Sequence, residues 1–198
     1  GTLALRDLRA RGIEPMAVLS LMARLGSSDP VELRSTLDEV IAGFDVTRFG
    51  TSPTKFDEAD LAPLSARVIG AMPYEAVADE LRGQGVPDEI AQRFWSVVRE
   101  NLANRAEAAQ WWAVFRDGPV GAEALLGEDL EFARSAVATL SEPPYTSETW
   151  GIWTAALKTE TGRKGRALFR PLRLAVTGAE RGPEMADVMP LLQRKPRV

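Results

Sequence analysis

A run of basic residues near the carboxyl terminus has the clearest chemistry in this 198-residue sequence. Between Thr161 and the end of that run no acidic residue occurs, and the run contains Arg163, Lys164, Arg166, Arg170 and Arg173. Residues 158–198 hold ten basic and four acidic residues, although the whole chain has a net charge of −4. A basic end on an acidic body suits the approach to a polyanion in one orientation. A solvated basic helix face would give the same pattern, so charge alone leaves both interpretations open.

Several kinds of reactive site are excluded by composition, because cysteine and histidine are both absent. Disulfides, thiolate or histidine metal sites, cysteine nucleophiles and serine–histidine triads cannot form. Residues 162–165 read Gly-Arg-Lys-Gly, which lacks the spacing and the hydroxyl of a phosphate-binding P-loop. No Gly-x-Gly-x-x-Gly motif follows a strand pattern. We therefore expect no catalytic residue, no metal ligand and no bound cofactor in this chain, and a self-contained hydrolase is disfavoured.

Acidic pairs and tryptophans have structural explanations. Asp57–Glu58 and Asp88–Glu89 stand at expected helix starts, where the helix dipole favours negative charge. The five tryptophans follow helical spacings, at Trp95, Trp111, Trp112, Trp150 and Trp153. This spacing favours core positions over stacking platforms, although at least one residue of each close pair must point away from the core.

Hydrophobic periodicity of the helical type dominates the chain and predicts a nearly all-α fold. The expected helices cover residues 14–25, 29–43, 60–72, 74–81, 87–102, 105–115, 128–140, 147–161 and 184–192. Residues 47–57 are expected to be irregular. Residues 168–176 fit either a strand, through their alternating Arg-Leu-Arg-Leu sequence, or a helix with Leu168, Leu172 and Val176 on one face.

The beginning of the chain looks like the middle of a longer sequence. It has no initiator methionine and no secretory signal pattern, and no apolar stretch is long enough to cross a membrane. We expect a soluble intracellular piece of a larger protein, with a domain boundary between residues 57 and 75.

Sequence blocks spread along the whole chain closely resemble bacterial glutamyl-tRNA synthetases of the alphaproteobacterial type. The first block covers residues 5–9, 12–17 and 21–29. The second, Ser-Pro-Thr-Lys-Phe-Asp, covers 52–57. The third covers 161–169, 171–178 and 182–184, and includes Thr-Gly-Arg-Lys-Gly-Arg-Ala-Leu-Phe. The blocks occur in the order of that family.

The resemblance implies the C-terminal part of a class I aminoacyl-tRNA synthetase. It implies a helical stem-contact domain over residues 1–66 and a helical-bundle anticodon-binding domain over 67–198. The catalytic domain and its Lys-Leu-Ser-Lys-Arg loop would precede Gly1, so ATP and Mg would be used by the full-length enzyme and not by this fragment. The implied partners are tRNA(Glu) and also tRNA(Gln), with no membrane, for a cytoplasmic monomer.

The resemblance also assigns tRNA contacts, at Lys55, Asn101, Arg163, Lys164, Arg166, Arg173, Pro183 and Met185. Pro183 and Met185 would lie against anticodon bases; alternatively they start the last helix, with Met185 in the core. Asn101 stands where discriminating members carry an arginine that reads the third anticodon base, which predicts acceptance of both tRNAs. Alternatively, Asn101 merely ends a helix.

Two other functions remain open at this stage. A helical protein–protein interaction module with no nucleic-acid role would explain the acidic body and the tryptophans, but not the ordered blocks. A paralogue that charges a restricted set of tRNAs would share the blocks.

Overall fold

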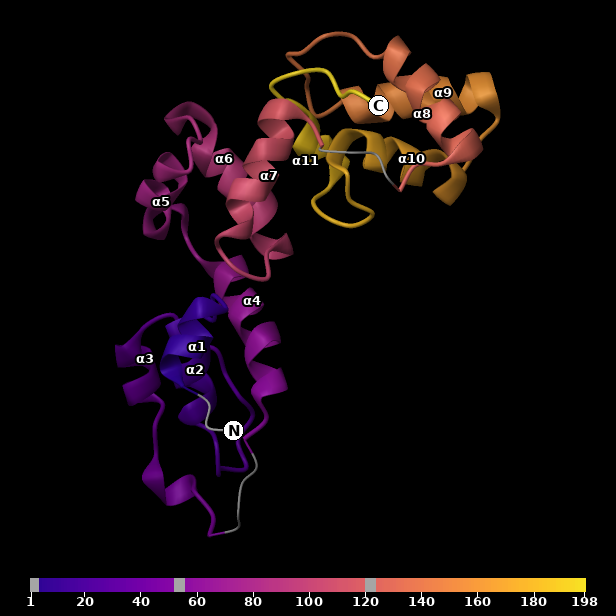
Figure 1. The fold of residues 1–198 in the computed structure, drawn as a ribbon. Helices are drawn as coiled ribbons and strands as arrows, with labels where there is room; N and C mark the ends of the chain where they lie inside the picture. Colours follow the sequence, from indigo (N-terminus) through magenta and orange to yellow (C-terminus); the bar gives the residue numbers. More distant parts are fainter. Residues whose placement is uncertain (1–3, 52–55, 120–123) are drawn as a thin grey trace. The chain divides into compact units, whose positions relative to one another are not determined.

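The computed structural model describes residues 4–51, 56–119 and 124–198 (Figure 1). These residues form helices joined by short loops, and the described part of the chain contains no strand beyond one isolated bridge between Ser27 and Phe49. The prediction of a nearly all-α fold is confirmed. Within the described ranges, no helix is long and apolar enough to cross a membrane.

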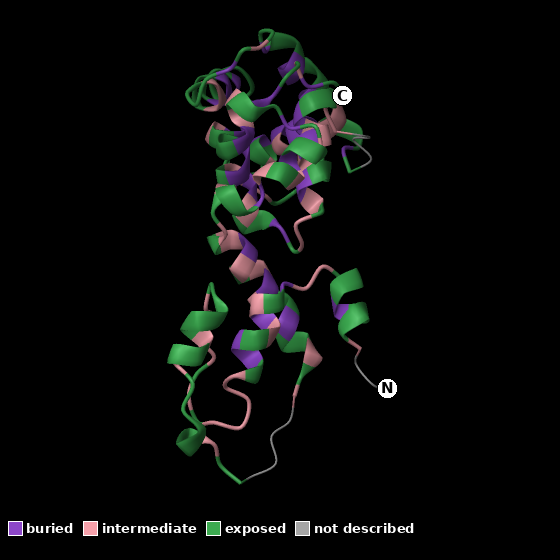
Figure 2. Ribbon diagram, turned by 90° about the vertical axis from the view of Figure 1, so that its left-hand side faces the viewer, coloured by how far each residue is buried: buried purple, intermediate pink, exposed green. Residues whose placement is uncertain are grey.

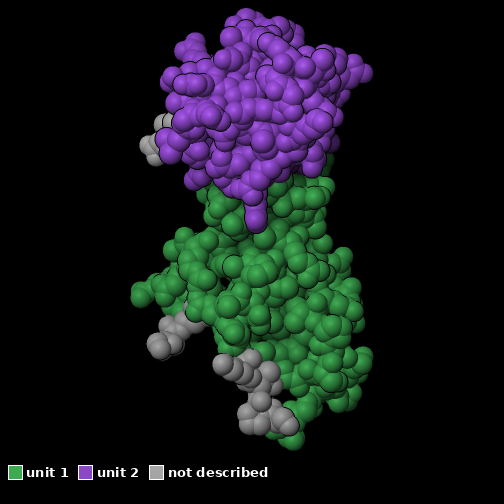
Figure 3. All heavy atoms as spheres, turned by 90° about the vertical axis from the view of Figure 1, so that its right-hand side faces the viewer, with its two compact units in different colours: residues 1–77, 99–107 green, residues 78–98, 108–198 purple. Residues whose placement is uncertain are grey.

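The chain divides into two compact units, coloured separately in Figure 3. Unit 1 comprises residues 1–77 and 99–107, and unit 2 comprises residues 78–98 and 108–198. Unit 1 therefore includes a short segment that follows the first helices of unit 2 in the sequence.

The first unit is built from four α-helices and four short 3-10 helices of the described chain. They are α1 (Leu5–Ala10), α2 (Pro15–Met22), α3 (Leu37–Ala42), η1 (Val46–Arg48), η2 (Glu58–Asp60), α4 (Leu61–Ala71), η3 (Tyr74–Ala76) and η4 (Arg99–Asn101). Its core gathers around Leu8, Leu21 and Leu61, with partly buried apolar side chains packed against them. Pro15 occupies the first turn of α2, as predicted, because proline needs no N–H partner there.

Residues 99–107 are attached to the beginning of the chain by polar contacts. The Arg105 Nε atom donates to Glu14 Oε1 at 2.8 Å, and the Glu14 N–H donates to Ser65 Oγ at 2.9 Å. Gly12 has a φ of +72°, and a Cβ there would meet the Asn104 Cβ at 2.7 Å. A glycine is required at this position both by the backbone conformation and by the close approach.

The helix predicted over 29–43 is much shorter in the structure, where only α3 is helical. The Thr36 side chain accepts a hydrogen bond from the Glu39 N–H and thereby starts the helix at Leu37. Before it, Asp29 pairs with Arg48 at 2.7 Å, and the Arg34 N–H donates to Ser20 Oγ at 3.1 Å. These contacts hold residues 29–36 outside a helix. No residue of α3 is buried (Figure 2).

Unit 2 contains α5 (Ala78–Gly83), α6 (Asp88–Val98), most of α7 (Glu107–Asp117), α8 (Gly127–Thr139), α9 (Thr149–Thr161), α10 (Arg166–Thr177), α11 (Met185–Val188) and η5 (Met189–Leu191). The predicted segment 74–81 is thus split between η3 and α5. The ambiguous segment 168–176 is helical, with Leu168, Leu172 and Val176 all buried.

The tryptophans behave as the spacing predicts. Trp95, Trp112 and Trp153 are buried, whereas Trp111 and Trp150, one from each close pair, are partly exposed. Phe94 is fully buried, and its ring meets those of Trp112 and Phe115 edge to face at 5.9 and 5.8 Å. Such edge-to-face pairs complement the ring quadrupoles.

Candidate nucleic-acid interface

The basic run lies at the junction between α9 and α10 and along α10 itself. Helix α9 ends at Gly162, whose φ of 71° is left-handed, and α10 follows Gly165, whose φ is 53°. The first turn of α10 has no side-chain cap and no acidic residue. Contacts from the preceding turn therefore stabilise its start, in addition to its buried side chains.

Arg163 supplies these contacts. Its Nη1 atom donates to Asp129 Oδ1 at 2.7 Å and to the Ala167 carbonyl at 3.0 Å. Its Nη2 atom donates to the Glu128 carbonyl at 3.4 Å, and its Cζ lies 4.3 Å from the centre of the Phe132 ring. We call this set of contacts the Arg163 clamp. It joins the α9–α10 junction to the start of α8 and occupies donors that a phosphate would otherwise use.

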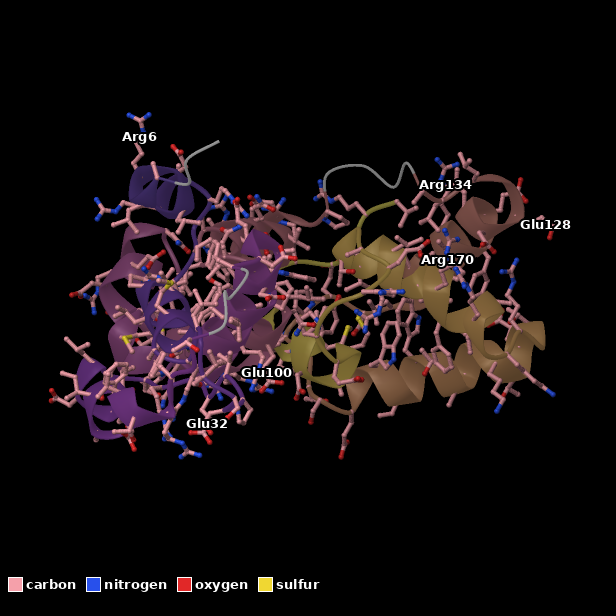
Figure 4. All side chains as sticks on the ribbon, turned by 90° about the horizontal axis from the view of Figure 1, so that it is seen from below. Arg6, Glu32, Glu100, Glu128, Arg134 and Arg170 are labelled. Carbon is pink, nitrogen blue, oxygen red and sulfur yellow. The ribbon has the colours of Figure 1, made fainter. Side chains whose placement is uncertain are left out.

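Arg170 is also engaged within the unit. Its Nε and Nη2 atoms contact Glu180 Oε1 at 2.7 and 2.6 Å, and its Nη1 lies 3.7 Å from Asp129 Oδ2. Figure 4 shows Arg170 on the edge of α10 that faces α8, the helix that carries Glu128 and Arg134. The hydrogen bond from Arg170, and then its charge, lower the pKa of Glu180, with smaller contributions from Arg166 and Arg181.

Arg173 holds the loop that follows α10. Its Nη2 donates to the Pro183 carbonyl at 2.9 Å, while its buried Nη1 has no hydrogen-bond partner among the described residues. Burial lowers the pKa of Arg173, and the charge of Glu184 partly offsets this effect. On the same loop, a Cβ at Gly182 would meet the Trp111 ring at 2.6 Å, so only glycine allows this approach.

Lys164 and Arg166 differ from the three engaged arginines because both are exposed. The side chain of Arg166 is 80% exposed, and within the described ranges its ion pair is a long one, 3.8 Å, to Glu180. These two residues therefore offer the most accessible cations among the predicted phosphate contacts of unit 2.

Pro183 and Met185 are buried, and Met185 is only 3% exposed. Met185 also begins α11. This placement is what the alternative interpretation, with Met185 in the core, predicts. A contact between Met185 and an anticodon base remains a prediction, and it requires the side chain to be uncovered.

Asn101 belongs to unit 1, where it is exposed at the end of η4. Two residues earlier, the Arg99 Nη1 donates to the Met72 carbonyl at 3.1 Å. Lys55 lies outside the described residues. Six of the predicted contacts therefore lie on or next to α10 in unit 2: Arg163, Lys164, Arg166, Arg173, Pro183 and Met185. Asn101 lies in unit 1.

The contribution of Glu180 and Trp111 to this surface was missed by the sequence analysis. Glu180 lies ten residues beyond Arg170, and nothing in local spacing indicates that the two pair. A signal for Arg170 was available, because it follows Arg166 by four residues and precedes Arg173 by three. In the described part of the chain, no group of three or more acidic side chains is arranged to hold a metal ion.

Comparison with known families decides what kind of domain carries this surface. Residues 73–196 match the family described as "Anticodon binding domain". The chain belongs to this anticodon-binding family. The match covers all of unit 2 except its last two residues and also includes the returning segment 99–107.

The relatives of this anticodon-binding chain are much longer than the chain itself. "Glutamate--tRNA ligase 2" of Dinoroseobacter shibae is 61% identical over 99% of the chain, and "Glutamate--tRNA ligase 1" of Ruegeria pomeroyi is 59% identical over 98%. The chain spans only 44% and 43% of these two proteins, less than half of each. The resemblance found in the sequence blocks is therefore confirmed.

Solved structures agree on the fold. A glutamate tRNA ligase from Elizabethkingia meningosepticum, crystallised in complex with its amino acid, matches with a TM-score of 0.69 at 18% identity. The match covers 93% of the present chain and 39% of the Elizabethkingia meningosepticum chain. A glutamate-tRNA synthetase from Elizabethkingia anophelis matches with a TM-score of 0.67. At such low identity the likeness establishes the helical fold alone.

Two neighbouring cations of the anticodon-binding domain should contribute very differently to stability. We predict that Arg163→Ala lowers the free energy of unfolding by about 1–3 kcal/mol, because Asp129 and the two carbonyls lose a charged donor. Lys164→Ala should change it by no more than about 0.5 kcal/mol, as is usual for exposed positions. Urea unfolding followed by circular dichroism measures both. Equal effects of the two substitutions would contradict the structural role of Arg163.

A second prediction concerns the pKa of Glu180, which Arg170 keeps below its ordinary value of 4.5. Because the folded-state pKa is lowered, the ionised Glu180 stabilises the fold above pH 4.5, and this contribution is lost as the pH falls through the folded-state value. Arg170→Gln should raise the pKa of Glu180 toward its ordinary value. Carboxyl NMR titration measures the shift, with Arg93→Gln as a control in the same unit. An unchanged pKa would show that the pairing is absent in solution.

Proposed function

We propose that this chain is the tRNA-binding part of a glutamate–tRNA ligase, which recognises the body and the anticodon of tRNA during ATP-dependent attachment of glutamate. The observation that carries the proposal is the identity of 61% to such a ligase over 99% of the chain. The anticodon-binding match over 73–196 and the basic run around α10 support it. A helical protein–protein interaction module has no comparable support.

In this proposal the two parts of the chain have different tasks. Residues 1–66 form the stem-contact domain, and residues 67–198 form the anticodon-binding domain. Basic side chains contact phosphates, and other side chains and the backbone contact unpaired bases, as is general for recognition of RNA loops. Lys55 in the first part and Pro183 in the second are further proposed contacts.

The remaining chemistry belongs to the full-length enzyme. Its catalytic domain would bind ATP, Mg and glutamate, and this chain contributes no reacting group. We propose a cytoplasmic, monomeric ligase that uses tRNA(Glu) and accepts tRNA(Gln) as well.

The simplest test of the proposal measures binding of tRNA(Glu) to the chain at several salt concentrations. Lys164→Ala and Arg166→Ala should each weaken binding about two- to fivefold, as expected for exposed ion pairs. Each should also reduce the slope of log affinity against log salt by about 0.7–0.9, because one phosphate contact is lost. Fluorescence anisotropy with labelled tRNA(Glu) measures both quantities.

The matched control is Arg93→Ala, which removes an exposed cation from α6 of the same unit. It should leave the salt slope unchanged. If Lys164→Ala and Arg166→Ala behave like this control, the basic run is only a solvated helix face.

A further prediction concerns the choice between tRNAs. In the full-length ligase, Asn101 should permit charging of both tRNA(Glu) and tRNA(Gln), because its short amide cannot replace the forked cation of arginine. Asn101→Arg should reduce charging of tRNA(Gln) about tenfold, the effect of one well-placed base contact. Aminoacylation kinetics with each tRNA measure the ratio.

Ala103→Arg serves as the control, since it places an arginine at an exposed position two residues away. It should not change the ratio of the two tRNAs. The prediction would be wrong if the unaltered ligase already rejected tRNA(Gln) as strongly as the Asn101→Arg variant does.

A further inference from the structure

One side of α10, exposed at Arg166 and Phe169 and partly buried at Arg170 and Arg173, has an unusual composition. Positions 166, 169, 170 and 173 follow the i, i+3, i+4, i+7 spacing of one helix face. In a surface helix this spacing normally carries the apolar side chains that face the core. Here it carries three arginines and Phe169, while Leu168, Leu172 and Ala175 are buried on the other side. We call residues 166, 169, 170 and 173 the arginine face.

Phe169 is 45% exposed in the middle of this face. Among the described residues, no aromatic ring stacks on it, and the recorded cation–π contact of the neighbouring Arg163 is with Phe132 instead. Phe169 therefore leaves much of its ring accessible, with no aromatic partner among the described residues. Ile152 of the same unit is 67% exposed, so apolar exposure by itself is not distinctive. What distinguishes Phe169 is its position between cations.

The cations around Phe169 are arranged before any partner binds. Arg170 is fixed by Glu180 at 2.6 Å, and Arg173 is fixed by the Pro183 carbonyl at 2.9 Å. Arg166, three residues before Phe169, is 80% exposed and available. Residues three and four apart on a helix are surface neighbours, with Cβ atoms about 5–6 Å apart. Phe169 thus has the exposed Arg166 as its helix neighbour on one side and the held Arg173 on the other.

The charge of the face selects the kind of partner. Positive charge is in excess, because Asp129, Glu180 and Glu184 are outnumbered by the five cations of the basic run. An apolar protein surface would leave the Arg166 cation to be desolvated without a partner, which is unfavourable. A polynucleotide matches both features, because its phosphates pair with cations while its unpaired bases stack on aromatic rings.

We propose that Phe169 is a stacking platform for one unpaired base of the bound tRNA, whose adjoining phosphates lie on Arg166 and Lys164. This inference rests on the proposed function and extends it to a residue that the sequence blocks do not single out as a contact. Stacking tolerates any base, so Phe169 contributes affinity without reading sequence.

Four variants of the chain test the proposal in the same tRNA binding assay. Phe169→Ala and Phe169→Leu should each weaken binding by about 5- to 100-fold, the usual loss when a stacked aromatic is removed. Phe169→Tyr should retain binding, because it keeps the ring. Ile152→Ala, the matched control on α9, should have no effect. The salt slope of Phe169→Ala should equal that of the unaltered chain, since no phosphate contact is lost.

The leucine variant separates stacking from simple apolar contact. If Phe169→Leu binds as tightly as the unaltered chain while Phe169→Ala does not, the side chain is an apolar contact and the proposal is overturned. A fully base-paired RNA provides a second readout, since it offers no unpaired base and its binding should not respond to Phe169→Ala. Urea unfolding of each variant checks that the fold is retained.

The binding assay distinguishes a wrong stacking role from a wrong proposed function. If Arg166→Ala weakens tRNA binding and Phe169→Ala does not, the proposed function stands and the stacking role is refuted. If the unaltered chain does not bind tRNA(Glu), the proposed function fails, and the stacking role is refuted with it.

Discussion

The start of α10 is held by one guanidinium group. Helix α9 ends at a left-handed glycine, the Arg163 N–H donates to Thr161 Oγ1 at 3.3 Å, and α10 begins without a side-chain cap. The Arg163 clamp adds contacts from this turn to Asp129, two backbone carbonyls and the Phe132 ring. Together with the buried Leu168, Leu172 and Ala175, these contacts set the direction in which α10 presents its outer side chains. The Nη donors that stabilise the turn in this way are engaged, so Arg163 offers fewer free donors to a phosphate.

The other cations of the basic run also divide into engaged and accessible side chains. Arg170 and Arg173 are committed to Glu180 and to the Pro183 carbonyl, which leaves Lys164 and Arg166 as the accessible pair. The engaged arginines still contribute positive potential, because an ion pair at the surface screens a charge without removing it. The basic run thus combines a rigid frame with a small accessible part.

Sequence periodicity predicted most of the helices and the nearly all-α class, because a buried face repeats every three to four residues whatever lies opposite it. It failed at 29–43, where Thr36 and the partners of Asp29 and Arg34 decide the backbone path. Those partners are up to 19 residues away in the sequence and leave no periodic signal. The candidate interface shows the same limit: a cation can be counted from sequence, but its exposure depends on acids such as Asp129 and Glu180. For Met185 the local sequence allowed both a base contact and a core position, and tertiary packing buries it.

The return of residues 99–107 to unit 1 has a consequence for how such a chain can be divided. The polypeptide passes between the units three times, after residues 77, 98 and 107. A single genetic crossover at residue 77 would separate Glu14 from Arg105 and Gly12 from Asn104. Exchange of unit 2 as an intact cassette would require at least two further junctions, or recruitment of a substitute for the nine returning residues. Replacing one unit by recombination is therefore harder in this chain than in a protein whose domains are joined by one linker.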